Sequence, residues 1–102
     1  MANPITNGYN YTHLSGAGTT TILAGIGATQ GSSTSPANTG VVGGIYVNAA
    51  GTSVTVYDSA TGAGAVVAAW GATVGTIDQP IQLKFGLTVV IVGTADVTVL
   101  WA

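Results

Sequence analysis

One histidine and a few serines are the side chains of this sequence that could act in nucleophilic catalysis. His13 is the only imidazole, and Ser15, Ser53 and Ser59 carry hydroxyls that such a base could activate with help from an aspartate. None of these serines lies in the G-x-S-x-G pattern of a nucleophile elbow. We therefore predict that the chain is not an enzyme and has no catalytic residue. We expect His13 to lie exposed at a strand end or in a loop.

The carboxylates are equally few. Asp58, Asp78 and Asp96 are the only acidic side chains, and Lys84 is the only cationic one. Asp58 and Asp96 each adjoin a strand end beside turn residues, so we expect each carboxylate to accept a local backbone N–H in an Asx-type turn. Calcium is the alternative ligand, but it takes about six to eight oxygen ligands, and no D-x-D-x-D-G segment is present.

The sequence lacks the patterns that hold other cofactors. It has no cysteine, which excludes a thiol nucleophile, a disulfide and a zinc–cysteine site. The loosely spaced glycines of residues 16–27 do not form a G-x-G-x-x-G turn between a strand and a helix, so we interpret them as turn glycines. We expect no metal site and no bound cofactor.

Low charge excludes several kinds of partner. Only 4% of the residues are charged, and the net charge is -2. One lysine cannot neutralise a phosphate backbone or form a polybasic membrane anchor. The longest segment of apolar residues and glycine, residues 62–72, is shorter than the roughly 20 residues of a membrane-spanning helix. Met1–Pro4 lacks the basic and apolar regions of a signal peptide, so we expect no nucleic acid, no membrane and synthesis in a cytoplasm without export.

Short segments rich in valine, isoleucine and threonine alternate with glycine-rich turns. These residues suit a pleated, half-buried surface, and no segment sustains the helical period of about 3.6 residues. We predict a single all-β domain over residues 1–102, a small antiparallel β-sandwich for which a jelly-roll arrangement is one form. The eight predicted strands are Tyr9–His13, Thr19–Ala24, Val41–Asn48, Ser53–Asp58, Ala65–Trp70, Ile81–Phe85, Leu87–Val92 and Asp96–Trp101.

Alternation within these strands predicts which side chains form the core. Apolar residues at every second position share one face of a strand. The residues expected to be buried are Val54, Val56, Ile81, Leu83, Phe85, Val97 and Val99, with Trp101 on the same side as the last two. Glycine-containing turns after Val47 and after Val92 predict two hairpins, each joining a strand to the next one along the chain.

Two segments are too polar to pack by themselves. We predict an extended N-terminal arm over residues 1–11 and an enlarged surface loop over residues 27–40, which contains serine, threonine, glycine and asparagine. One interpretation is that both are merely flexible. The other is that at least one of them becomes ordered against a partner by adding backbone hydrogen bonds.

The strand Leu87–Val92 is apolar on both faces, so we expect both to be covered. In a domain this small, we predict that the second cover is another subunit, in a homo-oligomer and preferably a trimer. The aromatic residues are expected in the core or at interfaces, and a carbohydrate-stacking surface remains an alternative. If the arm and the loop do not bind a partner, the predicted binding face is the strand surface carrying Tyr46 and Tyr57.

Five segments in a fixed order carry a resemblance to a known family. They are Thr19–Leu23, Gly44–Asn48, Val54–Asp58, Phe85–Val90 and Ala95–Val99. In this order, across residues 9–102, the chain resembles small virion proteins of tailed bacteriophages, of the capsid decoration (cement) or head-fibre type. The resemblance implies a β-sandwich without enzymatic activity or cofactor, in contact with the major capsid protein.

The function that these expectations favour is structural. We expect a capsid decoration protein that is made in the host cytoplasm, binds the outer capsid surface and stabilises the head of the virion. The alternatives are a head-fibre or tail-fibre component, or a module that binds a receptor or glycan.

Overall fold

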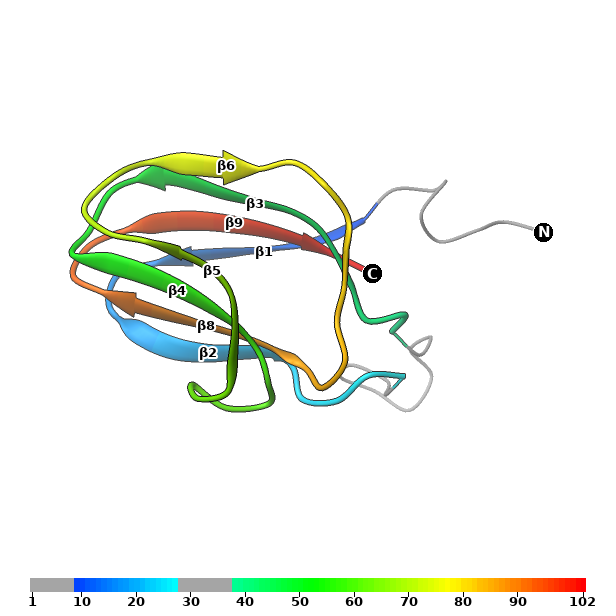
Figure 1. Ribbon diagram of the computed structural model, residues 1–102. Helices are drawn as coiled ribbons and strands as arrows, with labels where there is room; N and C mark the ends of the chain where they lie inside the picture. The colour runs from blue at the N-terminus through cyan, green and yellow to red at the C-terminus, as the bar shows by residue number, and fades with distance from the viewer. Residues whose placement is uncertain (1–8, 28–37) are drawn as a thin grey trace.

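The computed structural model describes residues 9–27 and 38–102, which form nine strands and no helix. The strands are β1 (Asn10–Ser15), β2 (Gly18–Leu23), β3 (Val41–Ala49), β4 (Ser53–Asp58), β5 (Ala65–Trp70), β6 (Gly75–Ile77), β7 (Ile81–Gln82), β8 (Leu87–Val92) and β9 (Asp96–Trp101). The first sheet has the order β1-β9-β3-β6, with β7 also paired to β3, and the second has the order β2-β8-β4-β5 (Figure 1). The prediction of an all-β sandwich is confirmed.

The strand pairing is that of a jelly roll. Strand β1 pairs with β9, β2 with β8, β3 with β6, and β4 with β5, so the chain forms a nested antiparallel ribbon that is rolled across both sheets. Four connections, β1–β2, β3–β4, β5–β6 and β8–β9, pass from one sheet to the other at the same end of the sandwich (Figure 1).

Both predicted hairpins are therefore wrong. The turns after Val47 and Val92 contain the expected glycines, but each joins strands of different sheets. The β3–β4 and β8–β9 connections pack on each other. The Thr52 N–H donates to the Val92 carbonyl at 2.8 Å, and a Cβ on Gly51 would lie 2.9 Å from that oxygen. The hairpin of the second sheet is instead β4–β5, joined by residues 59–64.

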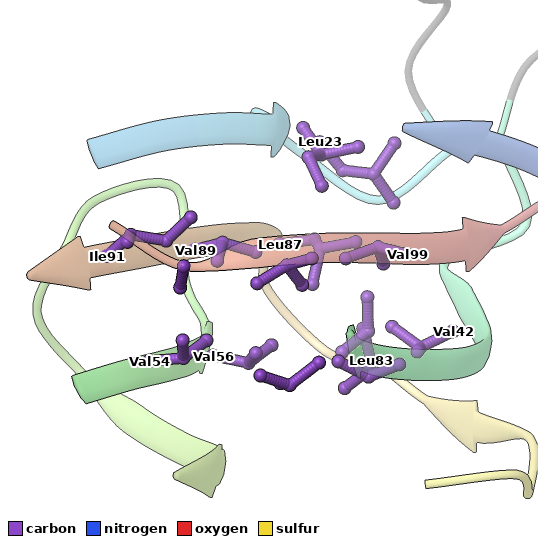
Figure 2. Packing of buried hydrophobic residues seen from close by; sticks show 14 residues of the cluster. Leu23, Val42, Val54, Val56, Leu83, Leu87, Val89, Ile91 and Val99 are labelled. Carbon is purple, nitrogen blue, oxygen red and sulfur yellow. The ribbon is translucent and has the colours of Figure 1, made fainter. Parts of the chain in front are cut away.

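Alternating side chains from both sheets meet in one core (Figure 2). Burial is confirmed for Val54, Val56, Leu83, Val97 and Val99. Ile81 and Trp101 are only half-buried, and both pack against this cluster.

Phe85 was expected in the core and is instead 67% exposed. Strand β7 ends at Gln82, so the alternation that would turn Phe85 inward does not continue to it. Instead, the backbone N–H groups of residues 84–86 donate hydrogen bonds to the carboxylate of Asp58.

Strand β8 is buried on its inner face, and the chain itself covers part of its outer face, where another subunit was predicted. Thr88 is fully buried and donates its hydroxyl to the Ser59 carbonyl at 2.9 Å. A Cβ on Gly62 would lie 3.1 Å from Cγ2 of Val90, so the β4–β5 loop also lies on this side chain. Val92, further along the same face, stays 48% exposed.

The predicted arm and loop lie partly outside the described residues, on residues 1–8 and 28–37. Within the described part, residues 10 and 11 belong to β1. Asn38 joins the two ends of the 27–40 segment: its Oδ1 accepts from the Gly27 N–H at 3.0 Å, and its Nδ2 donates to the Gly25 carbonyl at 2.9 Å.

Candidate functional site

The outer face of the first sheet carries two tyrosines together with charged side chains, and we call it the tyrosine face. Residues opposite one another in an antiparallel pair share a face. One row across the sheet is His13, Thr98 and Tyr46, and the next is Tyr11, Leu100 and Gly44. The tyrosine face comprises Tyr11, His13, Tyr46, Asp78, Asp96, Thr98 and Leu100.

Tyr46 lies along the sheet rather than standing away from it. A Cβ on Gly44 would lie 2.9–3.1 Å from Oη, Cζ and Cε2 of Tyr46, so only glycine leaves room for the ring at this position. The phenol donates a hydrogen bond to Oδ1 of Asp78 at 3.0 Å. This bond, partial burial and the negative charge of Asp78 all raise the pKa of Tyr46. The phenol therefore stays protonated and fixed in place.

A third tyrosine, Tyr9, lies against the neighbouring glycine, Gly43. A Cβ on Gly43 would lie 2.5–2.6 Å from Cζ and both Cε atoms of Tyr9. Nearly equal distances to these three carbons place the glycine against the face of the ring. Gly43 lies where β3 has a bulge against β9, between Val42 and Gly44.

His13 and Asp96 contact each other between β1 and β9, through Nε2 and Oδ1. Both side chains are roughly half exposed, so the expected exposure of the histidine is confirmed, but His13 lies within β1 rather than at a strand end or in a loop. The Asp96 carboxylate contacts a neighbouring strand, whereas the sequence suggested a contact within its own turn.

Asp58 also differs from its expected local turn. Its carboxylate accepts N–H groups of Lys84 at 2.9 Å, Phe85 at 2.8 Å and Gly86 at 3.3 Å, all from the segment between β7 and β8. Partial burial raises the pKa of Asp58, but the hydrogen bonds from Phe85, Lys84 and Gly86 and the charge of Lys84 outweigh it, so the pKa lies below its usual value. The carboxylate stabilises a distant loop.

The structure brings one of the conceivable catalytic sets onto one face. Ser15 is paired with Asp96 and lies on the same face of β1 as His13, but in the part of the chain that the structure describes no hydrogen bond joins its hydroxyl to the imidazole. Ser53 and Ser59 belong to the second sheet and its β4–β5 loop. Asp96 faces the histidine, but Asp58 is held by the β7–β8 segment. In residues 9–27 and 38–102, no three His, Asp or Glu side chains gather where they could hold a metal ion.

The outer face of the second sheet differs in chemistry, and we call it the uncharged face. Its rows contain Thr19, Val90, Thr55 and Ala69, then Thr21, Thr88, Tyr57 and Val66, with Val92 opposite Ser53. None of these side chains is charged, and Val66 and Val92 are about half exposed. Tyr46 and Tyr57 therefore lie on opposite faces of the sandwich, and the predicted single surface carrying both is wrong.

Comparison of the chain with protein-family models, with curated proteins and with solved structures finds no match. In the part of the chain that the structure describes, no helix is long and apolar enough to cross a membrane.

Alternation along the strands could not have revealed either face in full. Asp78 reaches Tyr46 only because β6 pairs with β3, and no strand was predicted at the residues of β6. Two adjacent glycines inside a predicted strand were the available signal, because an interior glycine often marks a bulge or a close approach.

Proposed function

We propose that this protein is a non-enzymatic structural component of a bacteriophage virion, a decoration protein that binds the outer surface of the capsid and stabilises the head. It is made in the host cytoplasm and then attaches to the virion through contacts with the major capsid protein. The observation that carries this proposal is the uncharged outer side of the second sheet, formed by the exposed parts of the uncharged face and by the uncharged β4–β5 loop that covers Thr88 and contacts Val90. The resemblance of five sequence segments to such proteins agrees with it.

An uncharged sheet face suits permanent contact with another protein. Burying charged groups costs free energy unless they are paired, and this face has none to bury. Each Å² of apolar surface removed from water contributes about 25 cal/mol, and stable interfaces bury about 1,200–2,000 Å². Val66 and Val92 provide exposed apolar side chains where such burial can begin.

The jelly-roll topology supports the proposal by analogy, because this architecture occurs in viral capsid and lectin domains. We further propose that the protein is a homo-oligomer, preferably a trimer, in which neighbouring copies share the apolar contacts. Sedimentation of the purified chain tests this point, and a monomer at all concentrations would contradict it.

The binding test compares two identical substitutions at exposed valines. Val92→Asp places a charge on the uncharged face, and Val74→Asp places the same charge in the β5–β6 loop, outside the strand rows of this face. We expect Val92→Asp to lose binding to capsids stripped of the protein, because a buried unpaired charge is costly, and Val74→Asp to bind as the wild type does. Equal saturation of capsids by both folded variants would contradict attachment through this face.

A head-fibre or tail-fibre component, or a module that binds a receptor or glycan, is the second candidate. The observation that favours it is Tyr11, whose ring is 72% exposed on the tyrosine face.

A further inference from the structure

We propose that the tyrosine face is a binding site for neutral glycans, in which a sugar ring stacks on tyrosine and its hydroxyl groups bond to the surrounding acidic and imidazole groups. The site lies on the opposite side of the sandwich from the uncharged face. Glycan binding is therefore compatible with attachment to a capsid and does not depend on it.

The aromatic part of the site is fixed before any ligand arrives. Similar distances from a Gly44 Cβ to Oη, Cζ and Cε2 place the phenol end of Tyr46 against the glycine, so this end of the ring lies on the sheet. The hydrogen bond to Asp78 holds the ring there. A ring that is already ordered loses little conformational entropy on binding.

The width of the site matches a single sugar ring. Leu100 lies between Tyr11 and Gly44 in one row across the sheet. Neighbouring strands are about 4.8 Å apart. Tyr11 and Tyr46 therefore lie on either side of the half-buried Leu100. The C–H groups of a sugar ring carry partial positive charge, which suits the negative face of an aromatic ring. Leu100 would contact the apolar side of the same ring.

The polar groups that a sugar also needs lie on this face. The chain has four charged side chains and one histidine; Asp78 is bonded to Tyr46, and Asp96, four residues from Leu100 along β9, is bonded to His13. Carboxylates accept hydrogen bonds from hydroxyl groups, and the imidazole and the Thr98 hydroxyl can donate them.

The negative charge of the tyrosine face favours neutral glycans over anionic ones. The site contains two carboxylates, whereas Lys84 lies beside Asp58 in the segment that follows β7. A sialylated or sulfated sugar would be repelled by the Asp78 carboxylate, which is bonded to a neutral phenol, because like charges that are not neutralised cost free energy on approach. The ligand is therefore a neutral hexose-type sugar.

The test is an NMR titration of the full chain with the methyl glycosides of glucose, galactose, mannose and N-acetylglucosamine, with sialyllactose as the charged comparison. We expect saturable amide shifts at Thr98 and Leu100 with at least one neutral glycoside and weaker binding of sialyllactose. Absence of saturable shifts with all four neutral glycosides, shifts confined to the uncharged face, or tighter binding of sialyllactose would overturn the proposal.

Two variants of the tyrosine face are compared with one control. Tyr11→Ala removes a largely exposed side chain and is expected to leave the fold intact. Tyr46→Ala removes the ring that lies against Gly44. Each should weaken binding by about tenfold, as loss of one stacking partner does, while Tyr57→Ala on the opposite face should bind as the wild type does. Unchanged affinity of the folded Tyr11→Ala variant would overturn the proposal, and this outcome leaves the capsid role unaffected.

Discussion

Individual residues connect segments that are far apart along the chain, and Asp58 is the clearest example. Its carboxylate gathers the N–H groups of three consecutive residues, Lys84 to Gly86. Because the folded protein lowers the pKa of Asp58, the ionised carboxylate stabilises the fold above the unfolded-state pKa, and this contribution is lost as the pH falls through the folded-state pKa.

The first prediction therefore concerns Asp58→Asn. We expect the variant to lower the free energy of unfolding at neutral pH by about 1 kcal/mol, a value reduced for solvent screening of a partly exposed group. Urea unfolding near neutral pH and at the lowest pH at which the wild type stays folded checks it, because the difference from the wild type should shrink as the pH falls through the folded-state pKa. A difference that is equal at both pH values would contradict the role of the ionised carboxylate.

Phe85 and Leu87 are two residues apart and have opposite environments. Phe85 is 67% exposed, whereas Leu87 is fully buried in the core. We expect Phe85→Ala to change the free energy of unfolding by less than about 0.5 kcal/mol and Leu87→Ala to lower it by about 2–5 kcal/mol. Denaturant unfolding of both variants measures this, and a similar loss in the two would show that Phe85 is buried.

At the scale of elements, close approaches between backbones determine how the strands meet. A Cβ on Gly86, just before β8, would lie 2.7 Å from the Leu23 carbonyl and 2.8–2.9 Å from backbone atoms of Ser59 and Ala60. Gly86 is thus the position at which β2, the β4–β5 loop and β8 come together. Gly71, after β5, has open space around it.

These two glycines form a matched pair for a test. Gly86→Ala should destabilise the protein by about 1–3 kcal/mol, because backbone atoms cannot move aside as flexible side chains do. Gly71→Ala should be neutral or stabilising by up to about 1 kcal/mol, because it only restricts the unfolded chain. Thermal unfolding of both variants checks this, and equal melting temperatures would be inconsistent with the close approach at Gly86.

The strands and most of the core were predictable because alternation is a local property. Val54 and Val56, like Val97 and Val99, alternate with polar neighbours, and their burial follows from that pattern alone. The strand partners were not predictable in this way. A glycine-containing turn after Val92 is compatible with a hairpin or with a crossing between sheets, and only long-range pairing decides between them.

The candidate site was less predictable than the fold. Strand β6 contains only Gly75–Ile77, too short for an alternation pattern, yet its pairing with β3 places Asp78 beside Tyr46. The partners of Asp58 lie 26 to 28 residues away, so a turn signal beside that aspartate could not identify them. Both contacts exist only once the sheets are assembled.

For the whole molecule, the two outer faces are proposed to have different roles. The uncharged face is proposed to bind the capsid, and the tyrosine face would then point away from it, where a glycan could reach Tyr11 and Tyr46. A decoration protein occupies sites that repeat across the capsid surface, whereas a fibre or tail component is present at few positions. The number of copies in each particle therefore distinguishes the two.

Quantitative mass spectrometry of purified virions tests most directly the central proposal, that this chain is a bacteriophage decoration protein. The ratio of this protein to the major capsid protein should be a fixed simple fraction, as expected when one oligomer occupies each repeating site on the capsid. Copies far fewer than the capsid subunits, at the level of vertex, fibre or tail proteins, or absence from purified particles, would contradict the account.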